Sequence, residues 1–397
     1  MALYSTWALL TLLCWLRRVA CLDVVGYLPE YRFSSVDWDG LVRSVSHLVL
    51  FSLEPSALGE VDGLDRMWPL ADPDSALNVA MRNAGPQACK VLLCLGGAGR
   101  SEHFPQIFEK GKLRKKLARS LSNILDMYPM LAGVDIDWEA PSEPEHWKGL
   151  ANFANLLRSQ WGNESKEHRL LTMTFHPRSG ATDAMKSMAS KSGKSFPELF
   201  DLMHAMAYTY YDNERRHSTL EQAVLAIEEC ERAGLPLSRV SLGVPFFGVS
   251  RRHGKTYSYG EIMDMDSSVR LHDHIDFAVE STYFNNRGTM TQKLQLAARK
   301  GLAGIMIWEL GQDKPLANSR SMLRHIASTV AEINNPSWRS SWLQYILLSE
   351  EQATMAAAMG MGLVFLFRVV TSKPAHQKSR REQQAKKEAK QDEAAAN

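Results

Sequence analysis

The sequence predicts an α/β protein of the (β/α)8 barrel class. Apolar runs of strand length alternate with amphipathic stretches, and most of these runs are apolar at nearly every position. Such continuity is typical of strands buried on both faces, as in a parallel sheet covered by helices. The eight runs and the stretches between them span roughly 300 residues, which fits a barrel of eight strand–helix units. They comprise residues 23–28, 46–53, 90–96, 131–138, 170–176, 202–208, 239–247 and 302–308.

Helical periodicity marks several of the stretches between these runs. Over residues 220–230 apolar side chains recur at helical spacing, behind a capping box in which Ser218 faces Glu221. Two further helices are expected over residues 104–128 and 315–333. Another helix is predicted by the spacing of Trp147, Leu150, Phe153, Leu157 and Trp161.

Composition narrows the class of protein. The 397 residues are 45% hydrophobic and 23% charged, as in an ordinary globular protein, and the net charge of +2 gives no electrostatic footprint for nucleic acid. The five cysteines do not form a disulfide framework.

A doubly wound open sheet is the alternative architecture. It would need a Gly-rich phosphate turn after the first strand, and Gly26-Tyr27-Leu28-Pro29 is not one.

Both ends of the chain carry apolar segments that predict targeting or membrane attachment. Residues 1–21 are assigned to a signal peptide or an uncleaved anchor, because residues 7–16 have the length of a signal-peptide core. Residues 353–370 are apolar apart from Arg368 and predict a transmembrane helix, with an Ala/Met-rich helix packed on the domain as the alternative.

The catalytic barrel is then assigned to residues 22–335, a linker to 336–352 and a charged disordered tail to 371–397. The sequon at Asn163 agrees with a secretory route. We therefore expect an extracellular or lumenal protein that is attached to a membrane through its C-terminal helix.

Three carboxylates occupy alternate positions in one run, Gly133-Val-Asp-Ile-Asp-Trp-Glu139. In a β-strand the side chains at i, i+2 and i+4 share one face, so Asp135, Asp137 and Glu139 point the same way. Burying like charges together is unfavourable unless some stay protonated or find partners. A lone Asp at a strand end is usually a turn residue or a helix cap. Three acids in strict alternation instead indicate coupled groups that tune one proton donor.

On a barrel these acids fall where active sites form, at the C-terminal ends of the strands. The fifth, sixth and eighth predicted strands end in His176, Tyr208 and Trp308. Aromatic faces stack on the apolar faces of sugar rings, and acids hydrogen-bond sugar hydroxyls. Each aromatic residue taken alone would be barrel core. Their shared position at strand ends predicts a sugar-binding site.

The acidic run resembles the fourth-strand signature of family-18 glycoside hydrolases, the chitinases and their relatives, which usually reads D-G-x-D-x-D-W-E. Between about residues 23 and 333, other segments are similar to further strand motifs of the family, in the same order and spacing. They are Val24-Val-Gly-Tyr27, Lys90-Val-Leu-Leu-Cys-Leu-Gly-Gly97, Met206-Ala-Tyr208, Leu242-Gly-Val-Pro-Phe-Phe-Gly248 and Gly301-Leu-Ala-Gly-Ile-Met-Ile-Trp308.

The resemblance implies retaining, substrate-assisted hydrolysis of β-1,4 bonds next to N-acetylglucosamine, in chitin or its oligosaccharides. It makes Glu139 the general acid, and Asp137 and Asp135 share a proton with it. Asp137 also orients the 2-acetamido group of the substrate. Tyr208 hydrogen-bonds the acetamido oxygen, and Trp308 forms the floor under the sugar. No metal or organic cofactor is required. The remaining residues assigned to substrate binding are Met206, Trp138 and Tyr27.

Two other functions stay open at this stage. One is an endo-β-N-acetylglucosaminidase that acts on N-glycans, although Trp138 beside the acid is more typical of chitinases. The other is a non-catalytic chitin- or oligosaccharide-binding protein on the same fold. Such proteins typically lose the acid, which is present here as Glu139. The pair His272 and His274 could start a metal site, but without a third clear ligand a solvated loop is the better reading.

The sequence departs from the family pattern at three positions. Ala132 replaces the first Asp of the fourth-strand motif, and Cys94 replaces a Ser of the third strand; we hypothesise that both changes fall in one polar network. Thr209 replaces an Asp that commonly touches the substrate. Asp212, three residues later, is a candidate substitute, but a surface Asp is the better interpretation of it. The segment between the seventh and eighth strands is too short for the α+β insertion of deep-cleft chitinases, which predicts a more open groove.

Overall fold

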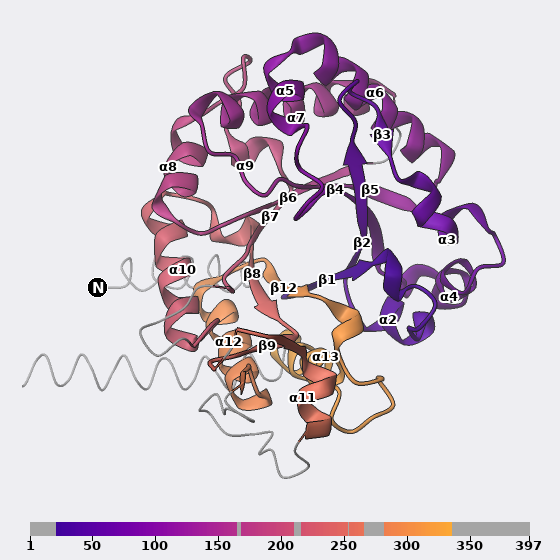
Figure 1. Cartoon of the computed structure of the whole chain (residues 1–397), viewed down its shortest axis with the longest axis vertical. Helices are drawn as coiled ribbons and strands as arrows, with labels where there is room; N and C mark the ends of the chain where they lie inside the picture. Colours follow the sequence, from indigo (N-terminus) through magenta and orange to yellow (C-terminus); the bar gives the residue numbers. More distant parts are fainter. Residues whose placement is uncertain (1–20, 165–167, 210–215, 253, 266–281, 336–397) are drawn as a thin grey trace, which may run out of the picture. The chain divides into compact units, whose positions relative to one another are not determined.

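The computed structural model describes residues 21–164, 168–209, 216–252, 254–265 and 282–335. Eight parallel strands close into a barrel with helices outside it, which confirms the predicted (β/α)8 class (Figure 1). The barrel closes because β1 pairs with both β2 and β12. Its strands are β1 (Asp23–Pro29), β2 (His47–Pro55), β4 (Lys90–Gly96), β5 (Leu131–Asp137), β6 (Leu170–Phe175), β7 (Leu202–Ala205), β8 (Val240–Pro245) and β12 (Gly304–Trp308).

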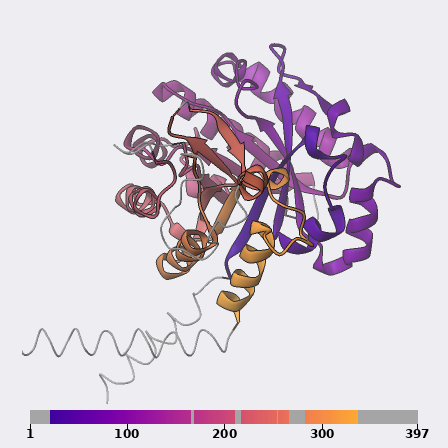
Figure 2. The ribbon, with the colours of Figure 1, turned by 60° about the horizontal axis from the view of Figure 1, so that its bottom comes forward.

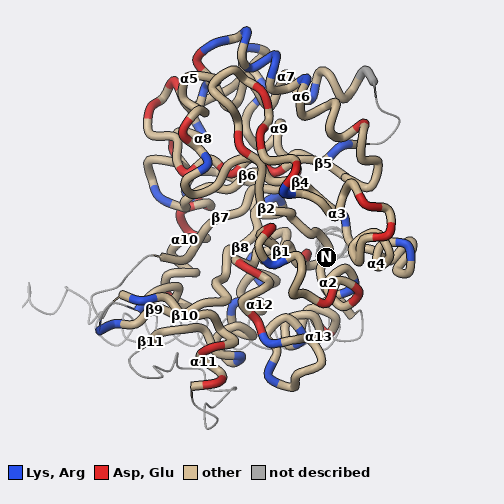
Figure 3. Tube along the Cα trace, turned by 45° about the vertical axis from the view of Figure 1, so that its right-hand side comes forward, with Lys and Arg blue, Asp and Glu red and all other residues tan. Residues whose placement is uncertain are grey.

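The helices surround this barrel, as the tilted view in Figure 2 shows. They are α2 (Trp38–Ser44), α3 (Trp68–Ala71), α4 (Ala76–Ala84), α5 (Phe104–Glu109), α6 (Gly111–Met127), α7 (Pro144–Glu164), α8 (Ser179–Ser187), α9 (Phe196–Leu199), α10 (Leu220–Arg232), α11 (Tyr259–Met265), α12 (Arg287–Lys300) and α13 (Met322–Asn334). Short 3-10 turns are η1 (Glu30–Arg32), η2 (Leu64–Met67), η3 (Gly85–Gln87), η4 (Leu237–Arg239) and η5 (Leu310–Gln312). Lysine and arginine are interspersed with aspartate and glutamate along the chain (Figure 3).

Three helix predictions need correction. The helix expected over residues 104–128 is two helices, because Lys110 adopts extended backbone angles between α5 and α6. The last helix begins at Met322 and not at residue 315. The Asp313 carboxylate accepts hydrogen bonds from the free N–H groups of Met322 and Leu323 at the start of this helix.

The cap of α10 also differs by one residue from its prediction. Thr219 forms the capping box with Gln222, whereas Ser218 and Glu221 were expected to do so. Ser218 has φ 53°, in the left-handed region, while an N-cap residue normally has extended angles, and Thr219 has them.

The segment between β8 and β12 carries more structure than its length suggested. A three-stranded antiparallel sheet is built from β9 (Phe247–Ser250), β10 (Thr256–Ser258), β11 (Thr282–Tyr283), and α11 packs beside it. The expectation that this segment lacks an α+β insertion is therefore wrong, and the inference of a more open groove loses its basis.

No helix within the described parts of the chain is long and apolar enough to cross a membrane. Residues 1–20 of the predicted N-terminal segment (1–21) lie outside the described residues, as do the predicted linker, transmembrane helix and charged tail.

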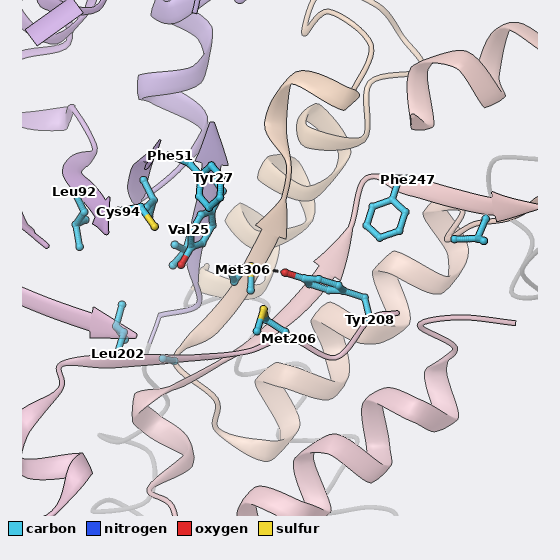
Figure 4. Packing of buried hydrophobic residues seen from close by; sticks show 13 residues of the cluster. Val25, Tyr27, Phe51, Leu92, Cys94, Leu202, Met206, Tyr208, Phe247 and Met306 are labelled. Carbon is cyan, nitrogen blue, oxygen red and sulfur yellow. Dashed lines mark hydrogen bonds between the residues drawn. The ribbon is translucent and has the colours of Figure 1, made fainter. Parts of the chain in front are cut away.

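The inner wall of the barrel combines apolar side chains with a few polar ones. A buried cluster runs through it, and Figure 4 shows its members converging from several strands; Val25, Val49, Leu92 and Met306 belong to it. β7 ends at Ala205 because the Ala207 N–H donates to the Ala205 carbonyl and leaves the ladder. Met206 and Tyr208, which were predicted on this strand, therefore follow it, at the C-terminal end of the barrel.

Candidate active site

A cavity opens at the C-terminal end of the barrel, where the site was predicted. Its walls come from β1, β5, β6, β12 and the segments that follow β4, β7 and β8. Six of the eight predicted site residues line it, while Asp135 lies below the cavity and Trp138 lies outside it. The lining residues are Tyr27, Ala98, Asp137, Glu139, Thr174, His176, Met206, Tyr208, Thr209, Phe247, Met306 and Trp308.

The acids rise along β5 from the barrel interior to the cavity. Asp135 is completely buried and accepts hydrogen bonds from the Tyr27 hydroxyl at 2.7 Å and the Thr172 hydroxyl at 2.6 Å. Asp137, also buried, accepts a short hydrogen bond from Thr174. Glu139 follows the strand and is exposed at the cavity. The two threonines come from the neighbouring β6, whose register with β5 places them beside the acids.

Burial and like charge together favour protonated acids at this site. Burial raises the pKa of Asp137 well above its usual range, and the charges of Glu139 and Asp135 raise it further. Partial desolvation of the carboxyl at the cavity wall also raises the pKa of Glu139, against a hydrogen bond that its carboxylate accepts from the Ala98 backbone. The pKa of Asp135 is raised by burial as well, while its hydrogen-bond donors oppose the rise. Asp137 and Glu139 therefore titrate as a coupled pair in which the protonated forms of both groups are favoured.

Two glycines at the C-terminal end of β4, Gly96 and Gly97, bring the backbone close to the acids. Gly96 has φ +104°, and a Cβ there would lie 2.2 Å from the Asp137 carbonyl oxygen. The Gly97 N–H donates to that same oxygen at 2.6 Å. Ser101 links the two segments, since its hydroxyl donates to the Asp137 carbonyl and accepts from the Glu139 N–H, both at 3.3 Å. These contacts fix the backbone on either side of the acid pair.

Aromatic residues form another part of the cavity wall. The Trp308 indole packs against Phe51 at 4.7 Å and Tyr27 at 5.8 Å between ring centroids. The Tyr208 hydroxyl donates to the Met306 sulfur at 3.8 Å, and its ring meets Phe247 edge to face (Figure 4).

The chain after Trp308 is fixed by a buried carboxylate. Glu309 is fully buried and accepts hydrogen bonds from the Arg32 guanidinium at 3.1 Å and from the Gly311 N–H at 2.8 Å. This ion pair joins the segments that follow the first and last barrel strands, and it holds Trp308 at the seam where the barrel closes.

The prediction that Trp138 contacts substrate is not supported by its position. The indole is buried away from the cavity, among Phe104, Phe108 and His146, with ring centroids between 5.1 and 5.4 Å apart. The reason is strand alternation: Trp138 lies between Asp137 and Glu139 in sequence and so faces the helices that cover the barrel. Its role is packing.

The two departures in the third and fourth strands do not form one network. Cys94 pairs in register with Asp135 and hydrogen-bonds that carboxylate, and burial keeps the pKa of its thiol well above the usual range. Ala132 instead lies where the pairing of β5 with β4 skips a residue, between Leu131 and Gly133, and it is only half buried. The hypothesis of a paired change is therefore not supported.

Sequence reasoning missed His204, a completely buried residue on β7. Its Nε2 lies 3.8 Å from an oxygen of Asp135, and neither ring nitrogen has a hydrogen-bond partner among the described residues. Burial lowers the pKa of His204 to about 3, so the ring is neutral near neutral pH. A signal was available, because His204 precedes Met206 by two positions and therefore shares its face.

The remaining predicted groups are three histidines and Asp212. Asp212 and the pair His272 and His274 lie outside the described residues. In the described ranges, no three His, Cys, Asp or Glu side chains gather as metal ligands would. His176 lines the cavity as expected, and burial lowers the pKa of its ring.

Comparison with known sequences gives one family. The model of glycosyl hydrolases family 18 matches residues 76–313. Chitinase 1 of Aphanocladium album is 23% identical over 279 residues, which cover 59% of this chain and 64% of that protein. Probable chitinase 2 of Drosophila melanogaster is 24% identical over 194 residues, 45% of this chain and 38% of that protein. The chain thus spans less than two thirds of the length of either relative.

Solved structures support the fold. The chitinase of the chitin utilization locus of Flavobacterium johnsoniae superposes with TM-score 0.61 at 22% identity, covering 79% of this chain and 95% of that one. A class V chitinase of Nicotiana tobaccum in complex with NAG4 gives 0.63 at 15% identity, covering 78% and 99%. A chitinase-like agglutinin from Robinia pseudoacacia gives 0.62 at 17% identity, with the same coverage. At these identities the similarity shows the barrel architecture.

The acid coupling can be measured directly. Replacing Glu139 with Gln removes the charge that acts on Asp137, so we expect the pKa of Asp137 to fall while it stays above the usual range because of burial. Carbon-13 NMR titration of the aspartate side chains measures this shift. The exposed Glu143→Gln is the matched control and should leave the titration unchanged. An unchanged Asp137 titration in Glu139→Gln would contradict the coupling.

Proposed function

The chain belongs to family 18 of the glycosyl hydrolases, and on that premise we propose that it cleaves β-1,4 bonds next to N-acetylglucosamine in chitin or chito-oligosaccharides. The proposed reaction is retaining and substrate-assisted, with Glu139 as the general acid. One observation carries the proposal: Glu139 lies at the cavity directly above Asp137, whose burial and charged neighbours favour a retained proton. The chitinase relatives and the NAG4 complex of the tobacco enzyme support the choice of substrate class.

In the first step, the proton of Glu139 passes to the glycosidic oxygen as the bond from that oxygen to the anomeric carbon breaks. The acetamido carbonyl oxygen of the same sugar forms a bond to the anomeric carbon and gives an oxazolinium-type intermediate. No enzyme carboxylate needs to act as nucleophile. Asp137 accepts a hydrogen bond from the acetamido N–H, and the Tyr208 hydroxyl donates a hydrogen bond to the acetamido oxygen. Both groups line the same cavity.

In the second step, Glu139 accepts a proton from water while the water oxygen attacks the anomeric carbon and the acetamido oxygen leaves. Two displacements at one carbon restore the β-configuration, and Glu139 regains its proton. The coupled acids match these changes of charge. When Glu139 is ionised, the proton that Asp137 retains limits the repulsion between them, and Tyr27 and Thr172 stabilise the Asp135 carboxylate below.

Two alternatives share the site. An endo-β-N-acetylglucosaminidase acting on N-glycans would use the same acids, and Thr209 in place of the usual Asp leaves the substrate contacts different from those of most chitinases. A non-catalytic oligosaccharide-binding protein is the second, since an agglutinin shares the fold. The presence of Glu139 together with Asp137 and Tyr208 in one cavity favours an enzyme over a binding protein. Hydrolysis of chitin oligomers and of a high-mannose glycopeptide, measured side by side, separates the three functions.

The decisive variant is Glu139→Gln. The amide keeps the shape of the side chain but has no proton to transfer, so we expect the release of a fluorophore from a chito-oligosaccharide glycoside to fall by about 10²–10⁴-fold. Binding of the unlabelled oligosaccharide, measured by calorimetry, should survive. Glu143→Gln, on an exposed segment near the site, is the control and should keep normal turnover. Near-normal turnover by Glu139→Gln would show that this residue is not the general acid.

The location of the enzyme is a proposal from the sequence alone. We propose that the barrel lies in the secretory pathway, lumenal or extracellular, and that residues 353–370 attach it to a membrane. We expect the full-length protein to stay with membranes in alkaline carbonate, and we expect a glycan at Asn163 that Asn163→Gln removes. Complete extraction by carbonate, without a glycan on Asn163, would contradict this location.

A further inference from the structure

We infer that Lys293 of α12 is a positioning residue for the proposed hydrolysis: it holds Ser218, which directly precedes the N-cap of α10, against the backbone beside Tyr208. The inference rests on the proposed function, because Tyr208 is the group that would contact the acetamido oxygen. It adds a residue that lies outside the cavity lining.

The Lys293 side chain is completely buried and ends in a dense set of acceptors. Its ammonium donates to the Ser218 carbonyl, to the Ser218 hydroxyl at 2.9 Å and to the Asn285 side-chain oxygen at 2.6 Å. Asn285 in turn donates to the Ser218 carbonyl at 2.9 Å. Burying an ammonium is strongly unfavourable unless hydrogen bonds compensate it, and a methionine or leucine would fill the same space without that cost. A directional role explains the lysine better than packing does.

The hydrogen bonds to the Ser218 carbonyl stabilise an unfavourable backbone conformation. The Ser218 φ of 53° is uncommon for a residue with a Cβ and persists where surrounding contacts determine it. Lys293 and Asn285 both bind the Ser218 carbonyl and so fix the orientation of that peptide. The conformation also explains why α10 begins one residue later than its sequence predicted.

Ser218 transmits the constraint to Tyr208. While its hydroxyl oxygen accepts from Lys293, its hydroxyl proton is donated to the Ala207 carbonyl at 3.1 Å, in the peptide that links Ala207 to Tyr208. The Tyr208 ring lies over Gly243, where an added Cβ would come within 2.9 Å of a ring carbon, so the ring has little freedom on that side. A shift of the Ala207–Tyr208 peptide would therefore move the phenol hydroxyl relative to Asp137 and Glu139.

A second contact path leads from the same cluster to the same ring. His217, next to Ser218, stacks on Phe247 at 5.1 Å between ring centroids, and Phe247 meets the Tyr208 ring edge to face at 6.2 Å. The His217 ring also hydrogen-bonds the Tyr283 carbonyl at 3.2 Å. Burial and the nearby Lys293 charge lower the pKa of His217 to about 4, which keeps this stacked ring neutral near neutral pH. Lys293, Ser218 and His217 thus constrain both the backbone beside Tyr208 and its ring.

The first test compares two lysines on one helix. Lys293→Met keeps the length of the side chain and removes its donors. Because a small misplacement of a group that acts in the transition state lowers turnover strongly, we expect kcat on a chito-oligosaccharide glycoside to fall by about 10–100-fold. KM should change less than about twofold. Lys300→Met, at the exposed end of α12, loses only its ion pair with Glu231 and should keep normal kcat and KM. Ser218→Ala removes one link and should lower kcat in the same direction, but less; it serves where Lys293→Met does not fold.

The second test is a double-mutant cycle with Tyr208→Phe. If Lys293 acts through the Tyr208 hydroxyl, then Lys293→Met should lower kcat by no more than about twofold in the Tyr208→Phe background. A general structural defect would instead lower kcat by the same factor in both backgrounds, and this additive result would overturn the inference. A fall in melting temperature with unchanged kcat would overturn it as well. These outcomes require an active parent protein. An inactive parent would contradict the proposed function itself, and the inference with it.

Discussion

Asp135 and Asp137 on β5 and Glu139 just beyond its end cannot all be charged without a large energetic cost, and side chains of the barrel interior are arranged around the protons that Asp137 and Glu139 retain. Other barrel strands supply the donors: the neighbouring β6 provides Thr172 and Thr174, and β1, which does not pair with β5, provides Tyr27. The donors to Asp135 oppose the rise in its pKa, while Asp137 keeps the stronger shift because burial and two neighbouring charges act on it together. This gradient along β5 places the retained proton next to Glu139, where chemistry would need it.

All three acids come from one strand and its end, so the rest of the cavity is formed by other strands and by the segments that follow them. The acids end one strand, and their partners for catalysis must approach from elsewhere in sequence. Trp308 is held by the ion pair of Glu309 with Arg32, and Tyr208 by the cluster around Lys293. In both cases a buried charged side chain fixes the backbone beside an aromatic group. Trp308 and Tyr208 are therefore positioned in the same way, each by a buried charged side chain that hydrogen-bonds nearby groups.

The sequence predicted the features that depend on local periodicity. Runs such as residues 90–96 are apolar on both faces, and the alternation of Asp135, Asp137 and Glu139 sets their common direction. Features that depend on tertiary partners escaped. Lys293 lies outside every helix that was predicted, and His204 is marked only by its position two residues before Met206; their partners Ser218 and Asp135 are set by the fold. The same strand alternation that aligned the acids also excluded Trp138 from the cavity, a consequence that the family motif obscured.

The most direct test of the account asks whether the substrate supplies its own nucleophile. A set of fluorogenic chito-oligosaccharides would carry acetyl, monofluoroacetyl, difluoroacetyl or trifluoroacetyl on the sugar before the cleaved bond, and kcat would be measured for each. Fluorine weakens the carbonyl oxygen as a nucleophile, so substrate assistance predicts a steep, progressive fall in kcat along the series. Equal kcat across the series would contradict the mechanism and, with it, the roles given to Asp137 and Tyr208.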